Sequence, residues 1–331
     1  LSGLHGSTNS PIIISGAGDG EVILDGTIGI AGPWQKQQHQ GQRIFYTAQA
    51  PRDILQLFVG GDMQPLARFP NAAWHNKSMF LANENWFKST KPGVHNTTTG
   101  EGVLLDAGPC ETEAECCRLC NTHGLAKSGI NATGAMAVLN LWSCDTTAQL
   151  VTKHEPGSST LFYNATYDGL CDVYRGGDGR YYLEGLPAFL DQPDEWLYNR
   201  TSGRILRTTD PGTKEVRGRI SETAFIINDA SNLVLANFSV FASAITVAGS
   251  IVNTRLQSLQ LNYSGISRRA LMETDAPIVN ALWSNETAKE DDQPLIVDDV
   301  VVRFSDGPGL LLGARGDVVV EHSLFEWNDW T

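Results

Sequence analysis

Short apolar runs separated by polar and glycine-containing turns recur through the last third of the chain. They have the length and composition of strands, and they lie at residues 224–227, 233–240, 256–261, 296–302, 310–312 and 318–320. The text LVLANFSV at residue 233 is similar to TRLQSLQL at residue 254, an offset of 21, and DVVV recurs at residues 299 and 317, an offset of 18. Such periods are typical of a solenoid in which each coil adds one strand to a parallel sheet.

A β-sandwich is the alternative to a solenoid for these runs. Its strands alternate with hairpin turns, for which Asn-Gly and Asp-Gly are the strongest signals. Beyond Arg217 such dipeptides are scarce, and Asp306-Gly307 is the exception. The pattern therefore favours stacked coils over a sandwich.

The first two thirds of the chain alternate differently. Residues 11–27 give two short apolar runs around a Gly/Asp turn, which is one turn of a coil. Three later segments predict antiparallel pairs: a hairpin around Gly60-Gly61, a strand, loop and strand over residues 134–163, and a hairpin around residues 199–203. Residues 11–27 therefore predict an early coil, and the three later segments predict a β-rich region between this coil and the last third of the chain.

All six cysteines lie in one window of 62 residues, at Cys110, Cys116, Cys117, Cys120, Cys144 and Cys171. An even number clustered in this way predicts up to three local disulfides, with fifteen pairings that the sequence leaves open. A zinc site is the alternative, and it is disfavoured because only Cys117 and Cys120 have ligand spacing. Residues 112–124 are predicted to form a short helix within this window.

Eight Asn-x-Ser/Thr sequons occur, at Asn76, Asn96, Asn131, Asn164, Asn199, Asn237, Asn262 and Asn285. Composition alone gives about three. The excess predicts a eukaryotic glycoprotein that passes through the secretory pathway to the cell surface or the extracellular space. The alternative is that the sequons occur by chance in a chain rich in Asn and Thr.

The formal net charge of −13, with no run of Lys or Arg, argues against nucleic acid and acidic membranes as partners. No apolar run approaches the roughly 18 residues that a membrane span needs. The chain begins at Leu1 in what resembles a strand and turn, so we expect sequence to precede it. A parallel stack normally ends in a cap, so we expect either continuation beyond Thr331 or a second chain as cap.

Specific motifs resemble secreted, carbohydrate-active proteins built on a right-handed parallel β-helix, the pectin-lyase-like glycoside hydrolases and polysaccharide lyases. One is Leu57-Phe58-Val59, Gly61, then Ala67-Arg68-Phe69-Pro70-Asn71; another is Leu190-Asp191, Pro193, then Glu195-Trp196 before a short hairpin. The segments at residues 11–27 and 134–163 are similar as well. The resemblance covers nearly the whole chain apart from the cysteine insert.

The resemblance implies an all-β fold: a right-handed parallel β-helix with an inserted, disulfide-bearing, β-rich subdomain. We expect first coils at residues 1–51, the subdomain at residues 52–212 with its cysteine-rich part at 110–171, and further coils, incomplete at the C-terminus, at residues 213–331. The family has glycine where this chain has Asp194, so we expect the elbow before Glu195 to bend differently.

The implied reaction is glycoside hydrolysis or uronate elimination. Hydrolysis needs two carboxyl groups, and elimination needs a base with Ca²⁺, Arg or Lys to neutralise the uronate. The coils offer Asp298, Asp299, Asp306, Glu321, His322, Glu326 and Asp329. Asp298 and Asp299 are adjacent, so we expect them to face opposite ways on a strand.

The candidate catalytic residues are Asp306, Glu326 and Asp329. Glu326 and Asp329 flank Trp327, and an aromatic beside carboxylates is typical of a sugar subsite; a solvated loop is the alternative. Asp306 also fits plain Asp-Gly turn chemistry. No metal site or cofactor is predicted, except Ca²⁺ if the chemistry is that of a lyase.

Two other residues invite functional interpretations. Arg68 is either a substrate contact or part of a buried structural ion pair, and we favour the second. His154 and Glu155 are adjacent and precede a Pro-Gly turn, so a structural role is favoured over acid/base or metal chemistry.

Two functions remain open. The first is a protein that cleaves or binds polysaccharide. The second is a silent β-helix subunit of an extracellular filament, coat or cell-surface assembly, in which self-assembly or another extracellular chain would be the partner.

Overall fold

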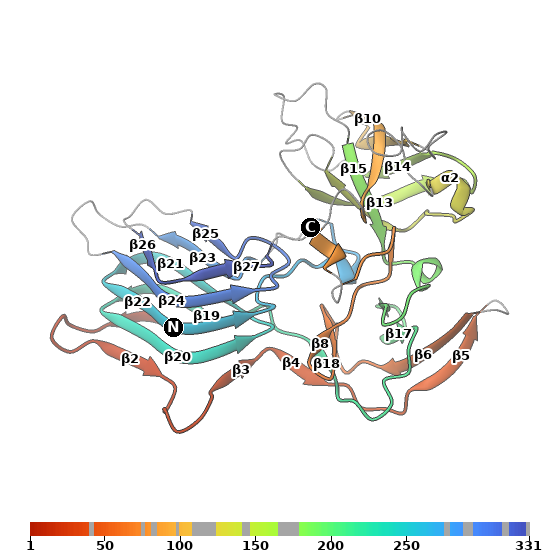
Figure 1. Cartoon of the computed structure of the whole chain (residues 1–331). Helices are drawn as coiled ribbons and strands as arrows, with labels where there is room; N and C mark the ends of the chain where they lie inside the picture. Colours follow the sequence, from red (N-terminus) through yellow and green to blue (C-terminus); the bar gives the residue numbers. More distant parts are fainter. Residues whose placement is uncertain are drawn as a thin grey trace. The chain divides into compact units, whose positions relative to one another are not determined.

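The computed structural model describes residues 1–39, 43–73, 77–80, 85–96, 99–107, 124–140, 146–164, 179–274, 279–286, 294–312 and 318–328. These residues are almost entirely β (Figure 1), which confirms the predicted all-β class. The helical pieces are α2 (Leu125–Ser128) and the 3-10 turns η1 (Ser78–Phe80), η2 (Pro187–Phe189) and η3 (Arg269–Leu271).

The chain forms two compact units. The parallel unit comprises Leu1–Ile28, Arg219–Ser267 and Pro277–Thr331, and the antiparallel unit comprises Gly29–Gly218 and Arg268–Ala276. The boundaries expected at residues 51/52 and 212/213 stay predictions.

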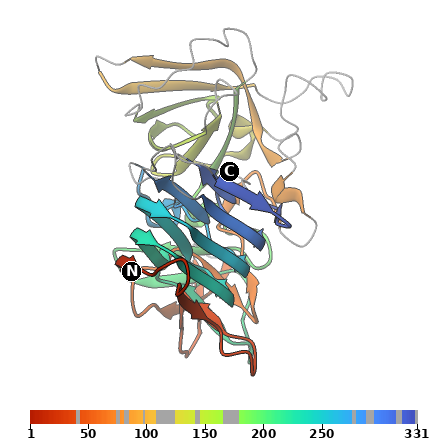
Figure 2. The same cartoon turned by 90° about the vertical axis from the view of Figure 1, so that its left-hand side faces the viewer.

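The parallel unit contains two sheets whose strands all pair in parallel (Figure 2). The first parallel sheet has the order β1 (Ser2–His5), β19 (Thr223–Ser231), β21 (Ala244–Val252), β23 (Leu282–Glu286) and β25 (Leu310–Leu312). The second has the order β2 (Ile12–Ser15), β20 (Leu233–Phe241), β22 (Thr254–Asn262), β24 (Leu295–Arg303) and β26 (Val318–Glu321), with β3 (Ile23–Asp25) beside β20 and β27 (Leu324–Glu326) beside β24. From β19 to β26, successive strands alternate between the two sheets, so each coil adds one strand to each.

The strand pairings test the predicted periods. Leu235 pairs with Leu256, which confirms the offset of 21. Asp298 pairs with Glu321, so β24 and β26 are related by 23 residues and the predicted period of 18 is wrong. The repeated letters DVVV do not occupy equivalent positions, because Val318 pairs with Leu295 at the start of β24.

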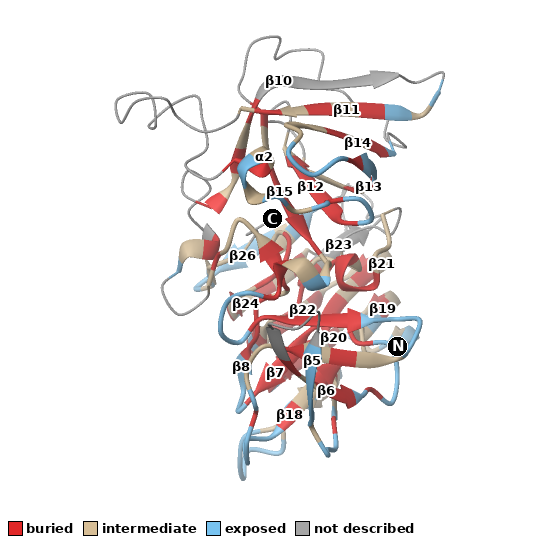
Figure 3. Ribbon diagram, turned by 90° about the vertical axis from the view of Figure 1, so that its right-hand side faces the viewer, coloured by how far each residue is buried: buried red, intermediate tan, exposed pale blue. Residues whose placement is uncertain are grey.

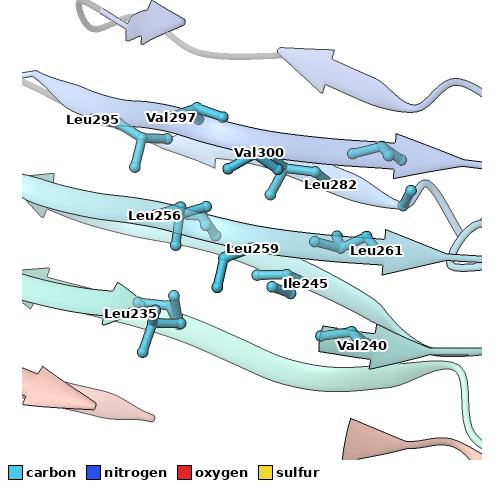
Figure 4. Close-up of a cluster of buried hydrophobic side chains, with 14 of the residues drawn as sticks. Leu235, Val240, Ile245, Leu256, Leu259, Leu261, Leu282, Leu295, Val297 and Val300 are labelled. Carbon is cyan, nitrogen blue, oxygen red and sulfur yellow. The ribbon is translucent and has the colours of Figure 1, made fainter. Parts of the chain in front are cut away.

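The core of the parallel unit lies between its two sheets (Figure 4). Along β24 the residues Leu295, Val297, Val300 and Val302 are buried. They stack on equivalent side chains of β22 and meet Ile245 and Leu282 from the first parallel sheet. Burial of this apolar ladder stabilises the stack, at roughly 1.5–3 kcal/mol for each fully buried aliphatic side chain.

Corner residues recur in the left-handed backbone region. One column of these residues is Ala242, Tyr263, Phe304 and Trp327, with φ between 52° and 59°. At another corner Asn232 and Asn253 have φ of 52° and 45°, and the Asn253 amide donates to Asn232 Oδ1 at 2.6 Å. Asn tolerates this region better than most residues, so the asparagine ladder satisfies both the turn and its side-chain hydrogen bonds.

Arg219 ties the beginning of the later coils together. Its side chain is fully buried and donates to the backbone carbonyls of Ser221 (2.7 Å), Tyr263 (2.6 Å) and Ser264 (2.8 Å). Burial lowers the pKa of Arg219 to about 9. The guanidinium therefore donates several hydrogen bonds to backbone carbonyl groups that lie outside the strands.

The antiparallel unit is built around a closed barrel. Its strands follow the order β10 (Phe87–Asn96), β11 (Glu101–Asp106), β14 (Thr160–Asn164), β13 (Thr147–His154), β12 (Met136–Asn140) and β15 (Gly179–Glu184), and β15 pairs back with β10. Strands β12 and β15 are largely buried (Figure 3). The loop predicted between residues 141 and 160 contains the strand β13, whose apolar alternation is broken by Gln149 and Thr152.

Two smaller sheets complete this part of the chain. One has the order β16 (Trp196–Asn199), β17 (Arg204–Arg207), β6 (Arg43–Gln49) and β5 (Gln35–His39), all antiparallel. The other has the order β4 (Thr27–Gly29), β18 (Val216–Arg219), β7 (Leu57–Val59) and β8 (Asp62–Met63). Both predicted hairpins form, but the returning strand of the first ends at Met63, and β9 (Arg68–Phe69) pairs with β15 instead.

The elbow before β16 is held by a buried carboxylate. Glu195 is 1% exposed, and its Oε2 accepts hydrogen bonds from the backbone N–H groups of Asp191 (2.8 Å) and Gln192 (3.0 Å). Asp194 has φ of +68°, the region that glycine favours. Asp194 thus adopts a glycine-like conformation, and the expectation of a different bend stays a prediction.

Candidate functional site

The outer face of the second parallel sheet carries the polar residues that its interior excludes. In β22 the buried Leu256, Leu259 and Leu261 alternate with Arg255, Gln257 and Gln260. The pairing of strands places residues of one kind in columns across the sheet, with a spacing of about 4.8 Å between neighbouring strands. Side chains from four coils thus meet on one surface.

A bulge in each strand turns a second side chain to this outer face. The bulged residues Asn237, Ser258, Asp299 and His322 have φ between 51° and 59°. In β24 the buried Val297 and Val300 bracket Asp298 and Asp299, so the bulge breaks the alternation. The expectation that Asp298 and Asp299 face opposite ways is wrong for this reason.

Three titratable residues gather beside this bulge. Asp298 (β24), Glu321 (β26) and His322 have ligand-type atoms that all lie within 4.8 Å of one another. His322 Nδ1 lies 3.0 Å from Asp298 Oδ1, and Arg255 Nη1 lies 3.2 Å from Asp298 Oδ2. The Asp298 carboxylate is only 14% exposed, whereas the His322 ring is 76% exposed. We call these four residues the acidic cluster.

The charges of the acidic cluster act on the pKa of His322. The hydrogen bond to Asp298 and the charges of Asp298 and Glu321 raise the pKa of His322 above its ordinary value. Arg255 adds a permanent positive charge on the opposite oxygen of Asp298. Asp298 thus lies between the Arg255 guanidinium and the His322 ring, with Glu321 exposed next to it.

The acidic cluster does not fit Ca²⁺. That ion takes about six to eight oxygen ligands, whereas here one of the three close groups is an imidazole and the Arg255 guanidinium occupies one oxygen of Asp298. Both features oppose a hard cation at this position.

A second charged pair and an aromatic column lie further along the same strands. Arg303 Nε donates to Glu326 Oε1 at 2.6 Å, and each side chain is 37% exposed. At the neighbouring corner the rings of Tyr263 and Phe304 stack with centroids 5.1 Å apart. Glu326 therefore lies in strand β27 and is ion-paired, which differs from the solvated loop considered for it.

The other two candidate catalytic residues have different outcomes. Asp306 is 2% exposed, and its Oδ2 accepts hydrogen bonds from the backbone N–H (2.9 Å) and hydroxyl (2.6 Å) of Ser267. That burial gives Asp306 a structural role in holding the turn at Ser267. Asp329 lies outside the described residues.

Arg68 and His154 are structural in the antiparallel unit. Arg68 is fully buried, donates to the carbonyls of Pro70 (3.0 Å) and Asn85 (2.8 Å), and lies 3.8 Å from the centroid of the Tyr182 ring. Burial lowers its pKa, against the favourable charge of Glu184. His154 Nδ1 accepts from the backbone N–H of Ala132, and Nε2 lies 3.0 Å from the Ser158 carbonyl.

The predicted modification sites fall partly within the described chain. Asn131, Asn164, Asn199 and Asn237 are exposed and Asn262 is half-buried. Asn96 lies in β10 and Asn285 in β23, while Asn76 lies outside the described residues. All six cysteines and most of the helix predicted at residues 112–124 also lie outside them. Glycosylation and disulfides stay predictions.

Arg255 is the site residue that sequence reasoning missed. It lies 43 residues before Asp298, and the pairing that joins them spans an enlarged coil. The sequence did indicate its position: Arg255 is an outward-facing residue of the alternating strand TRLQSLQL, so it lies next to outward-facing residues of the strand that pairs with β22.

No helix in the described part of the chain is long and apolar enough to cross a membrane. Neither a family model nor a curated protein sequence matches the chain. A solved structure titled "Glycoside hydrolase" is similar to it, with 14% sequence identity and a TM-score of 0.58. The likeness covers 93% of this chain and 57% of that one, so this chain spans a little over half of the neighbour's length. At this identity, the comparison establishes a shared fold with that glycoside hydrolase.

Proposed function

We propose that the chain is part of a secreted, N-glycosylated protein that binds and hydrolyses an extracellular polysaccharide on a right-handed parallel β-helix. The observation that carries the proposal is the acidic cluster, in which Asp298 and Glu321 present carboxylate oxygens within 4.8 Å on an exposed sheet face. The fold shared with a glycoside hydrolase supports the same substrate class.

The two carboxylates approach closely enough for a retaining reaction, since one oxygen of each lies within 4.8 Å of the other. Retaining enzymes place their carboxyl groups about 5–5.5 Å apart, whereas inverting enzymes need about 6.5–9.5 Å to admit a water. Asp298, positioned by its contacts with Arg255 and His322, is suited to act as nucleophile or as stabiliser of the positive charge at the sugar. Glu321, exposed beside it, is suited to proton transfer with the leaving oxygen.

The proposed secretion has its support in the sequons. Four of the eight asparagines lie on the described surface with exposed side chains, where an attached glycan meets no packing obstacle. Expression in a eukaryotic secretory host, followed by mass analysis before and after removal of N-glycans, tests this part of the proposal.

The catalytic proposal is tested with charge-neutral isosteric variants. Asp298→Asn and Glu321→Gln should each lower release of reducing ends from neutral polysaccharides by at least about a hundredfold, because each removes one member of the pair. The matched controls are Asp62→Asn and Glu155→Gln, which neutralise exposed carboxylates in the antiparallel unit. Full activity in both cluster variants would contradict the proposal.

NMR titration of His322 tests the geometry of the acidic cluster independently of its catalytic role. Asp298→Asn should lower the pKa of His322 measured by NMR titration, because the hydrogen bond and charge of Asp298 raise it. If the variant lowers the pKa of His322 but hydrolytic activity is unchanged, the contact between Asp298 and His322 exists and the acidic cluster has no catalytic role.

A silent structural protein is the second candidate. Both oxygens of Asp298 are engaged, Oδ1 by His322 and Oδ2 by Arg255 and Gln257, as a purely structural ladder requires. This candidate predicts no hydrolysis of any polysaccharide and a concentration-dependent assembly detectable by sedimentation, and the cluster variants would then weaken folding without an effect on catalysis.

A further inference from the structure

A cavity lies in the antiparallel unit and shares no residue with the acidic cluster. Its volume is about 670 Å³. One wall is formed by residues 29–34, which follow β4, and the other by Asp210, Gly212 and residues 214–216, which lead into β18. Small-molecule sites commonly have volumes of about 300–1,000 Å³. The cavity is therefore large enough for one or two sugar rings.

Trp34 gives the cavity an aromatic wall that is held in place. The indole is half-buried, and the guanidinium carbon of Arg207 lies over it, 6.0 Å from the ring centroid. Arg207 is itself 1% exposed and donates to Gln64 Oε1 at 2.9 Å. A fixed ring at the edge of a cavity is a stacking surface for the C–H face of a sugar.

The charges around the cavity nearly cancel. Glu215 is paired with Arg217 at 2.8 Å, which leaves Asp210 and Lys214 as exposed groups of opposite sign. An anionic ligand would face the carboxylates of Asp210 and Glu215, and a cationic ligand would face the ammonium of Lys214. Hydroxyl groups, in contrast, accept from an ammonium and donate to a carboxylate, so the lining favours a neutral, hydroxyl-rich ligand.

We infer that this cavity binds a ring of a neutral oligosaccharide, with its apolar face on Trp34 and its hydroxyls on Asp210 and Lys214. The ligand class is the same as that of the proposed function, and the site consists of different residues in the other unit. The two assignments therefore stand or fall separately.

Gly29 lines the cavity and can carry a side chain without a clash. A side chain added there meets no atom within 4 Å, and the residue does not need the left-handed backbone region. Gly29 lies at the end of β4, where a β-branched residue is well tolerated. Gly29→Val should thus obstruct a ligand while leaving thermal stability unchanged.

The test is calorimetric titration of the whole chain with cellohexaose, xylohexaose, mannohexaose and chitohexaose. At least one should bind saturably, and Trp34→Ala and Gly29→Val should each weaken its binding about tenfold or more, while Trp34→Phe retains most of it. Lys214→Ala should weaken binding severalfold, and the matched control Lys127→Ala, which removes an exposed charge from α2, should not.

The outcomes distinguish this inference from the proposed function. Binding that is lost in Trp34→Ala and Gly29→Val but kept in Asp298→Asn and Glu321→Gln supports the cavity. Binding lost only in the cluster variants overturns the cavity and leaves the proposed function standing. Absence of saturable binding by all four oligosaccharides overturns the cavity as a neutral-sugar site, whatever the hydrolysis assays give.

Discussion

Single residues in this chain often take a conformation or an ionisation state that their type disfavours. Asp194 occupies a glycine-like backbone region, Glu195 is a carboxylate with 1% exposure, and Arg219 is a guanidinium with none. The Asp194 N–H donates to the Thr209 hydroxyl, the Glu195 carboxyl group accepts from the Asp191 N–H, and the Arg219 guanidinium donates to the Ser264 carbonyl. Local backbone geometry and hydrogen bonding therefore explain why Asp194 and Glu195 occur at the elbow that the family resemblance singles out.

Replacing Asp194 by glycine should reduce stability less than replacing it by a β-branched residue. A non-glycine residue pays roughly 1–2 kcal/mol in the left-handed region, less for Asp, while glycine costs more entropy on folding. Asp194→Gly should therefore leave the free energy of unfolding within about 1 kcal/mol, and Asp194→Val should lower it by about 1–2 kcal/mol. Urea unfolding checks both values, and equal stability of the Val variant and the parent would refute the strained elbow.

Glu195 should make folding stability fall with pH. Burial raises its pKa from 4.5 to about 7, against the backbone N–H donors of Gln192 and Asp191, which favour the ionised form. The folded chain thus holds a proton that the unfolded chain releases above pH 4.5. This group's contribution is full below that pH, declines as the pH rises to the folded-state pKa, and amounts to on the order of 3 kcal/mol.

Glu195→Gln should remove this decline. The free energy of unfolding of the parent should fall relative to that of the variant between pH 4.5 and about 7, and the two profiles should run parallel above that range. Urea unfolding at a series of pH values measures both. Parallel profiles across the whole range would mean that Glu195 is ionised in the folded chain.

Strands and turns were predictable to different degrees. The apolar runs of β20, β22 and β24 are long and continuous, and the sequence located them within a few residues. β21 was missed because Thr246, Gly249 and Ser250 interrupt its apolar positions. The acidic cluster was beyond reach because its members lie on different coils, and the bulge at Asp299 reverses the facing that simple alternation predicts.

The register between β24 and β26 can be tested by cross-linking. Ile296 and Val319 are paired neighbours on the outer face, and adjacent strands are close enough for a disulfide. Ile296→Cys with Val319→Cys should cross-link on oxidation, as detected by mass spectrometry of linked peptides. Val301→Cys with Val319→Cys, the pairing that a period of 18 would require, should not, since Val301 pairs with Leu324.

The described residues form an apolar core in each of the two units. One lies between the parallel sheets and contains Leu256, and the other lies in the barrel and contains Leu139. Neither core shares a buried residue with the other among the described positions. Each unit therefore packs around an apolar core of its own.

Cavity-forming substitutions should reveal this division. Leu256→Ala and Leu139→Ala should each lower stability by about 2–5 kcal/mol. Hydrogen exchange should accelerate mainly in β20, β22 and β24 for the first variant and mainly in β12, β13 and β15 for the second. Uniform acceleration across both units in either variant would show that the two cores unfold as one.

The enlarged coil between β22 and β24 indicates how such a protein can gain sequence during evolution. The steps between paired strands are 21, 41 and 23 residues, yet the columns of paired side chains continue across all of them. Because rung position is fixed by hydrogen bonding and not by chain length, extra sequence is accommodated as an excursion from a corner. New loops can accordingly be grafted there by evolution or by an engineer, adding recognition elements while the scaffold beneath keeps its alignment.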